Sequence, residues 1–154
     1  MNRVLAVYDM CNRFPFGKIL FSKLICFKAP YFQTICPVFT ELEPGFGKIF
    51  MKNRRRVRNH INSVHAIAMC NMCELVGGTV LECSIPSHLR WIPKEMRVEY
   101  LKVARTDLTA SCRLGEIVWQ DSMELPLTVE VADTSGILVL RATITMYVSL
   151  KKKS

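Results

Sequence analysis

Residues 59–81 read NHINSVHAIAMCNMCELVGGTVL, and nearly every side chain in this stretch is small or apolar. Glu74 is its only Asp, Glu, Lys or Arg. A helix that is apolar on all sides is buried, so the stretch predicts one long core helix. We expect Ser63 to be its N-cap, and Gly77 and Gly78 to let another backbone approach its far end.

The segments around this helix alternate apolar and polar residues, as strands do. The clearest alternation spans residues 138–150, and a turn at residues 133–136 predicts an antiparallel hairpin with a strand near residues 125–131. Further strands are expected at residues 32–42, 46–51 and 96–101. Residues 86–93 are expected to form a loop that carries Trp91. One antiparallel sheet curled around a single apolar helix satisfies both apolar surfaces, which is the α+β architecture called a hotdog.

The chain has 154 residues, the size of one domain. We expect a single domain over residues 1–154, with an N-terminal helical segment at 1–30 and the hotdog core at 31–150. Residues 14–28 can form an amphipathic helix, which we expect to pack on its own domain rather than on a membrane. The seven cysteines are an odd number and follow no recognisable secretory signal, which predicts a cytoplasmic protein without a membrane partner.

The spacing of three residues resembles the signature of phenylacetate-pathway-type acyl-CoA thioesterases of the hotdog superfamily. In that family an Asn precedes a His-Gly-Gly by six positions, and an Asp or Glu follows that His by nine. Asn59, His65 and Glu74 keep both spacings. Residues 91–101 resemble an uncharacterised bacterial branch of this superfamily. The resemblance implies hydrolysis of an acyl-CoA or related acyl thioester, without a cofactor, at a site shared between subunits.

Glu74 is the candidate catalytic residue on physical grounds as well. An isolated carboxylate in a buried apolar helix is costly unless it is paired or used in the chemistry. It can activate water as a general base or attack the carbonyl carbon directly. The alternative is a structural carboxylate that accepts from a backbone N–H or an arginine.

Asn59, His65 and Ala66 complete the predicted site. The Asn59 side chain and the Ala66 backbone N–H can stabilise an oxyanion if Ala66 lies at the positive start of the helix. Ala66 and Ile67 stand where the family has glycines, and the added methyl restricts how closely a thioester approaches. We expect His65 to position this turn by hydrogen bonding. A loop-capping Asn59 and a merely packed His65 are the alternatives.

The helix geometry predicts a site built from two chains. Nine helical residues from His65 to Glu74 advance about 13 Å and turn about two and a half times. One chain therefore cannot bring both ends of this segment to one carbonyl. A two-fold dimer with antiparallel core helices can, so we expect a dimer or a dimer of dimers.

The formal charge of +8 favours an anionic partner, which can be nucleic acid, a membrane surface or a phosphate-bearing small molecule. Cations that suit the phosphates of coenzyme A are Arg54, Arg55, Arg56, Arg58, Lys102 and Arg105. A solvated charged face is the alternative. Nucleic acid is disfavoured because neither interleaved aromatic residues nor a recognised motif accompanies these cations.

Two other functions remain open. His60 lies fourteen residues before Glu74, the spacing of hotdog hydroxyacyl dehydratases, although the prolines of that motif are missing. A non-catalytic hotdog that binds acyl-CoA is the other. Cys70 and Cys73 form a lone CxxC, for which core packing is favoured over a redox or metal site, and no metal is expected.

Overall fold

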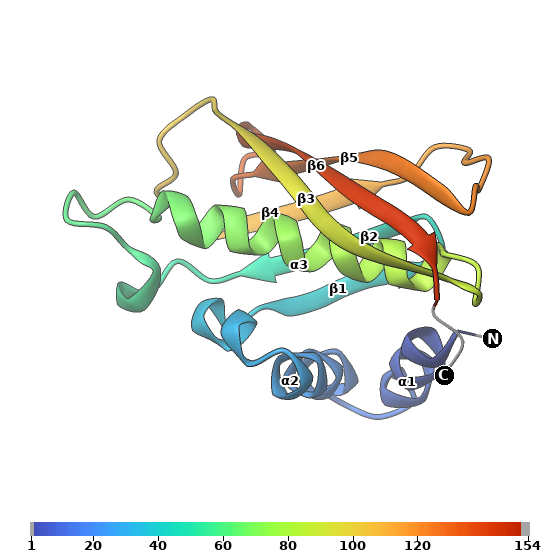
Figure 1. The fold of residues 1–154 in the computed structure, drawn as a ribbon. Coiled ribbons are helices and arrows are strands. Elements are labelled where there is room, and N and C mark those ends of the chain that lie inside the picture. Colours follow the sequence, from blue (N-terminus) through green and yellow to red (C-terminus); the bar gives the residue numbers. More distant parts are fainter. Residues whose placement is uncertain (1, 152–154) are drawn as a thin grey trace.

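The computed structural model describes residues 2–151, and its centre is one antiparallel sheet of six strands (Figure 1). The strands lie in the spatial order β1-β2-β4-β5-β6-β3, which leaves β1 and β3 at the two edges. Their bounds are β1 Val38–Glu43, β2 Phe46–Met51, β3 Leu89–Tyr100, β4 Leu108–Arg113, β5 Ser122–Ala132 and β6 Leu138–Leu150.

The sheet curves around α3 (Ala66–Ser84), the long helix at the centre of the molecule (Figure 1). Helix and sheet approach closely at β2, where a Cβ on Gly47 would lie only 2.6 Å from Val80 Cγ2. In the described part of the chain α3 is the one helix long and apolar enough to cross a membrane, but 67% of its apolar window is buried, as in a core helix. A sheet wrapped around one buried helix is the predicted α+β hotdog architecture.

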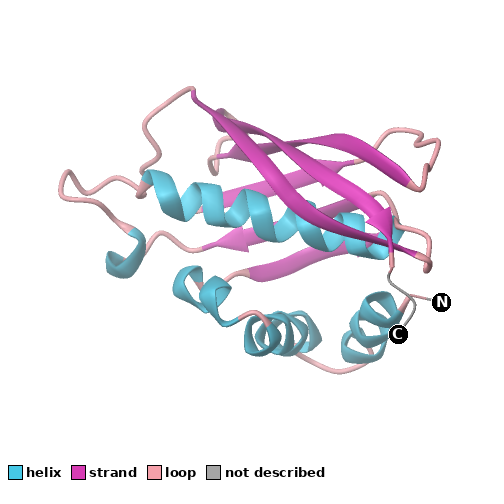
Figure 2. Cartoon of the chain, viewed as in Figure 1, coloured by secondary structure: helices cyan, strands magenta, loops and turns pink. Residues whose placement is uncertain are grey.

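Three helical segments precede the sheet: α1 (Arg3–Asn12), α2 (Gly17–Lys28) and a short 3-10 helix, η1 (Pro30–Ile35). They gather on one side of the molecule, away from β5 and β6 (Figure 2). Phe21 of α2 is fully buried and packs edge-on against Tyr8 of α1 and Phe39 of β1, with ring centroids 5.0 and 5.2 Å apart. α2 therefore packs on the core, but through Phe21, Ser22 and Cys26. The prediction is wrong about the face that packs, because the apolar side chains expected to do so are exposed: Phe16, Ile19, Leu20, Leu24 and Phe27.

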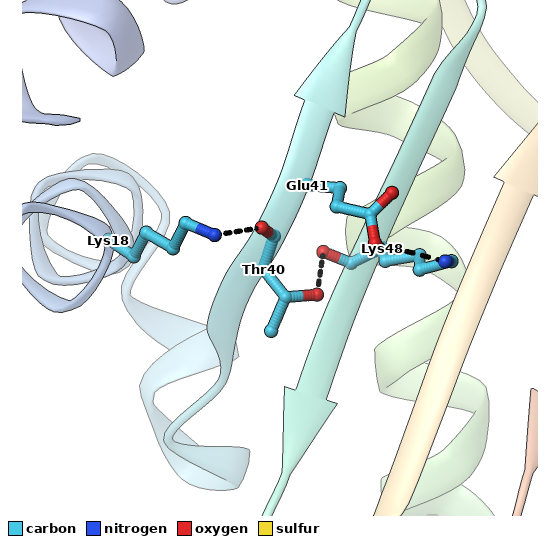
Figure 3. Close-up of polar contacts among 4 residues, drawn as sticks. All are labelled: Lys18, Thr40, Glu41 and Lys48. Carbon is cyan, nitrogen blue, oxygen red and sulfur yellow. Dashed lines mark hydrogen bonds and ion pairs between the residues drawn. The ribbon is translucent and has the colours of Figure 1, made fainter.

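Side chains of α2 form hydrogen bonds with backbone groups at the outer edge of β1. Ser22 Oγ accepts a hydrogen bond of 2.8 Å from the Phe39 N–H. Lys18 Nζ donates a hydrogen bond of 2.5 Å to the Thr40 carbonyl (Figure 3). The strand register shifts between Phe39 and Glu41, and a bulge of this kind disrupts further pairing at an edge. The β1 edge is thus occupied, whereas β3 pairs with no strand of the described chain other than β6.

Two sequence predictions about these elements are wrong. Residues 30–35 form η1 rather than the start of a strand, because a proline begins this helical turn and Cys36 ends it with a left-handed φ of 45°. Trp91 lies in β3 and not in a loop. Pro93 fits there because β3 is an edge strand whose register shifts between Pro93 and Glu95.

Candidate functional site

α3 begins at Ala66, and its N-cap is His65 rather than the predicted Ser63. His65 Nδ1 accepts a hydrogen bond of 3.1 Å from the Ile67 N–H, so the imidazole holds the first helical turn as expected. The Ala66 N–H finds no acceptor within the part of the chain that the structure describes. It is a free donor at the positive end of the helix.

Asn59 holds together the turn that leads into α3. Its Oδ1 accepts hydrogen bonds from the N–H groups of Ile61 and Ser63, both at 3.1 Å. Its Nδ2 donates to Ser63 Oγ at 2.8 Å, which explains why the Ser63 hydroxyl does not cap the helix. One amide N–H of Asn59 has no acceptor among the described residues. Asn59 thus makes the loop-capping contacts of the alternative interpretation and keeps one donor for a ligand.

Asn59 and Ala66 line one cavity of about 320 Å³. Met69 of α3 forms part of its wall, and Tyr100 and Lys102 close it from the segment at the end of β3. The fold therefore brings the two predicted oxyanion donors together, with one predicted phosphate ligand beside them.

Glu74 lies on the wall of a second cavity, of about 460 Å³. The prediction that this carboxylate is buried is wrong for the single chain, because its helix face looks onto the cavity and not onto the sheet. Among the residues described, no ion pair reaches the Glu74 carboxylate, and no hydrogen bond links it to another residue's side chain. The structural alternative requires an arginine or a backbone N–H to hold the Glu74 carboxylate, and the described residues provide no such contact.

The wall of the Glu74 cavity is mostly apolar and comes from the N-terminal helical segment, from α3 and from β3. Its apolar members are Val4, Ile25, Ala29, Phe32, Leu75, Gly78, Trp91 and Pro93. A Cβ on Gly78 would lie 2.7 Å from Trp91 Cη2, so Gly78 admits the indole and not a backbone. The indole N–H donates to Glu82 Oε2 at 2.8 Å. Sequence reasoning missed Trp91 and Glu82 as wall residues, although the Gly77-Gly78 pair marked the place of close approach.

Three of the six cations predicted to bind phosphates lie at the end of α3 where the helix begins. Asn53 joins their two loops, since its N–H donates to Asp107 Oδ1 and its Nδ2 to the Arg105 carbonyl, both at 2.7 Å. Arg58 Nε donates to Asn53 Oδ1 at 2.8 Å. Arg58, Lys102 and Arg105 therefore flank the end of α3 that carries the predicted oxyanion donors.

The other three predicted cations are divided. Arg56 lines a third cavity, of about 240 Å³, together with Arg58 and His65. Arg55 is exposed on the short helical turn η2 (Arg55–Val57). Arg54 lies elsewhere, in a cavity beside α2, and its buried Nε has no hydrogen-bond partner among the described residues.

The remaining candidates of the sequence stand apart from this site. Cys73 is fully buried, and burial raises the pKa of its thiol, as expected of a core side chain. Cys70 Sγ lies 3.6 Å from the Tyr100 hydroxyl. Within residues 2–151 no group of three His, Cys, Asp or Glu residues could hold a metal ion. His60 is exposed in the turn before α3 and does not line the Glu74 cavity.

A sheet wrapped around one core helix gives the chain the hotdog fold, which solved structures of proteins named as thioesterases share. Residues 17–148 match the family described as a domain of unknown function, DUF4442, and the chain belongs to that family. The predicted resemblance to an uncharacterised branch is confirmed.

Solved structures show the same fold. One from structural genomics is 41% identical and superimposes with a TM-score of 0.85 over 96% of this chain and 99% of that one. A probable thioesterase of Pseudomonas aeruginosa is 24% identical, with a TM-score of 0.77 over 90% and 97% of the two chains. A thioesterase of Haemophilus influenzae is 10% identical, with a TM-score of 0.70 over 80% and 85%. No curated protein matches the sequence.

Proposed function

We propose that this protein hydrolyses an acyl-CoA or a related acyl thioester at a site shared by two chains. Glu74 of one chain faces the Asn59 amide and the Ala66 N–H of its partner subunit. One observation carries the proposal. Among residues 2–151 the carboxylate of Glu74 has no ion-pair partner on the wall of its mostly apolar cavity, and the N–H at the start of the same helix has no acceptor.

The strand edges support the two-chain arrangement. Ala66 and Glu74 line different cavities of one chain, and eight helical residues separate them by about 12 Å along the axis. β3 has an unpaired edge, whereas α2 occupies the edge of β1. Two β3 edges paired across a two-fold axis set the two α3 helices antiparallel, so that Glu74 of each lies toward the start of the other.

The chemistry needs no group beyond these residues and water. Glu74 takes a proton from water, and the hydroxide attacks the thioester carbonyl carbon. The Ala66 N–H and the remaining Asn59 N–H stabilise the oxyanion. Collapse of this intermediate breaks the C–S bond, and the thiolate receives the proton that Glu74 holds. In the alternative route Glu74 attacks the carbonyl carbon directly, and collapse of the intermediate breaks the C–S bond, so that the thiolate leaves and a mixed anhydride remains. Water then hydrolyses the anhydride to the free acid and the Glu74 carboxylate, and the thiolate takes up the proton that this step releases.

The surroundings of the two cavities support an acyl thioester as the substrate. The apolar wall around Trp91 and Phe32 suits an acyl group, and the volume of about 460 Å³ is within the range of small-molecule sites. Arg58, Lys102 and Arg105 suit the phosphates of coenzyme A or of a carrier-linked pantetheine. All seven cysteines are free thiols, which favours a reducing compartment and a cytoplasmic location.

A non-catalytic acyl-CoA-binding protein is the second candidate function. It is favoured by Asn59, whose amide is largely engaged in its own turn, and by the methyl of Ala66 beside the free N–H. The dehydratase alternative has less support, because the exposed His60 lies in the turn before α3, away from the Glu74 cavity.

An acyl-CoA panel tests these functions against one another. We expect thiol release from at least one acyl-CoA, and a fall of about 100-fold in turnover for Glu74→Gln, which keeps the size of the side chain but removes its basicity. The matched control is Glu82→Gln on the same helix, because this glutamine retains an acceptor for the Trp91 indole. Its turnover should stay within about threefold of the turnover of the unchanged protein. Binding without thiol release would favour the non-catalytic function, and hydration of an enoyl-CoA the dehydratase.

A further inference from the structure

α2 carries a second apolar face that no other part of the described chain covers. Phe16, Leu20, Leu24 and Phe27 follow one another at spacings of three or four residues, and we call them the outer stripe. All four are exposed, and Phe16 and Phe27 are the most exposed, at 82% and 88%. Isolated exposed apolar residues are ordinary, but a contiguous stripe on one helix marks an interaction surface.

The rotation of α2 about its axis is set by contacts on its other face. Ser22 Oγ donates to the Lys18 carbonyl at 2.7 Å and accepts from the Phe39 N–H at 2.8 Å. Phe21 is buried between two aromatic rings. With these residues facing the core, positions 20 and 27 point to the opposite side of a helix with 3.6 residues per turn, and position 24 lies at the flank. Phe16 precedes α2 as its N-cap, with a left-handed φ of 62°, and its side chain is exposed beside the start of the helix. The contacts of Ser22 and Phe21 therefore hold α2 in the orientation that exposes the outer stripe.

Along the chain the charges around the outer stripe are all positive, although Glu41 and Glu43 of β1 line the same cavity as Phe16 at one end of the stripe. No Asp or Glu occurs between Asp9 and Glu41, whereas Arg13, Lys23 and Lys28 flank the stripe. The fourth cation of the segment, Lys18, donates to the Thr40 carbonyl, and Glu41 pairs with Lys48 at 3.0 Å (Figure 3). A partner for this face must accept aromatic side chains and cations together.

We propose that the outer stripe docks reversibly on an anionic membrane surface. Phe16, Leu20, Leu24 and Phe27 enter the boundary between headgroups and acyl chains, while Arg13 and Lys23 contact anionic headgroups. Lys28 is not needed for this contact, because it lines the Glu74 cavity. A second copy of the chain fits poorly, because a two-fold contact would place the same cations against one another with no acidic residue of the segment to pair with them. The stripe is separate from the β3 edge, so membrane docking and the proposed dimer do not compete.

Flotation of the whole protein with lipid vesicles tests this surface. We expect it to float with vesicles of equal parts phosphatidylcholine and phosphatidylglycerol, to stay behind with pure phosphatidylcholine, and to be released by high salt. The paired variant Phe16→Ser with Phe27→Ser should lose at least about tenfold in bound fraction. The control is Val118→Ser, since Val118 is 82% exposed but lies outside the N-terminal segment, and this variant should float like the unchanged protein.

Two readouts keep the test independent of the proposed enzyme activity and of folding. The paired variant should keep its circular dichroism melting curve and its turnover on soluble acyl-CoA, because both side chains are exposed and lie outside the Glu74 cavity. Equal flotation with neutral and anionic vesicles, or unchanged flotation of the paired variant, would overturn the proposal. So would light scattering that showed the paired variant to have a smaller mass than the unchanged protein, since the stripe would then cover a second copy.

Discussion

Ala66 contributes to the proposed site through its backbone alone, which allows the donor to be removed without changing a side-chain contact. Proline is well tolerated at the first position of a helix, and the preceding His65 already has the extended conformation (φ −64°, ψ 135°) that a proline requires. Ala66→Pro should therefore leave the melting temperature nearly unchanged. Turnover should fall by about 100-fold or more, the usual effect of losing one oxyanion donor.

Ala66→Gly is the control for this variant, because it keeps the N–H and removes the methyl. It should retain the turnover of the unchanged protein or exceed it. If Ala66→Pro hydrolysed the thioester as fast as Ala66→Gly, the N–H at this position would have no part in the reaction.

Cys112 links the stability of the core to pH. Burial raises the pKa of its thiol from 9.0 to about 12. Below pH 9 both the folded and the unfolded chain hold the proton, so its contribution to stability is complete there. Above that pH the unfolded chain loses the proton first, and the free energy of unfolding falls until the pH reaches the folded pKa. At pH ~10.5 the loss from this thiol amounts to about 2 kcal/mol.

Cys112→Ala removes this contribution. Urea unfolding at pH ~8 and pH ~10.5 should show a drop in the free energy of unfolding that is smaller by about 2 kcal/mol in the variant. Other groups titrate alike in both proteins, so the difference isolates Cys112. Parallel pH profiles of the two proteins would show that this thiol ionises as readily in the folded chain as in the unfolded one.

The contact between α3 and β3 depends on one glycine. A Cβ on Gly78 would lie 2.7 Å from the Trp91 indole, whereas a Cβ on Gly77 would lie 3.4 Å from Val129 Cγ2, an ordinary contact. Gly78→Ala should destabilise the fold by about 1–3 kcal/mol, because the indole must move. Gly77→Ala should be neutral or stabilising by up to about 1 kcal/mol through its higher helix propensity.

Urea denaturation of the two glycine variants decides between steric and propensity effects at this contact. Equal changes in the two would mean that the indole of Trp91 yields freely. The Gly78 variant should also lose turnover on long acyl groups, since Trp91 forms part of the Glu74 cavity wall.

Regular elements were predictable from the sequence where one pattern governs a long stretch. The alternation in β6 and the unbroken apolar run of α3 each have a single structural solution. The N-terminal segment was predicted to be helical over residues 1–30, but α1 as a separate helix and the turn η1 were not predicted. Short segments of this kind owe their helical form to packing on α3 and β1 rather than to their own periodicity. The N-cap of α3 was predicted at Ser63 instead of His65 for a related reason. The Ser63 hydroxyl is engaged by the Asn59 amide, and the sequence alone does not show this tertiary contact.

The positions of the candidate residues were predictable but their environment was not, and their role in a site stays a prediction. Asn59, His65, Ala66 and Glu74 lie on or beside α3 as their spacing required. The exposure of Glu74 was not predictable, because an apolar helix can face a cavity as well as a packed sheet. The wall of that cavity comes from residues as far apart as Val4 and Trp91, and no local pattern joins them.

At the scale of the whole molecule, mixed dimers test whether the site belongs to two chains. Homodimers of Ala66→Pro and of Glu74→Gln should each be nearly inactive. In a mixed dimer one site collects both lesions and the other has none, so random reassortment should restore roughly a quarter of the original activity. Turnover measured after subunit exchange, with the exchange followed by mass spectrometry, checks this expectation.

A same-chain site predicts a different result. Every site would then keep one lesion, and mixing would restore nothing. Light scattering on the unchanged protein provides the companion measurement, because a monomer at micromolar concentration would also contradict a shared site.

Because the edge of β1 is occupied, chains that pair through the open edge of β3 cannot extend the sheet any further. A sheet with two free edges can add copies at both ends and grow into a fibre without limit. Here Ser22 and Lys18 have already taken the Phe39 N–H and the Thr40 carbonyl at one edge, and the strand bulges between Phe39 and Glu41. Each chain therefore offers a single surface for sheet extension, and polymerisation through strand edges terminates after one addition.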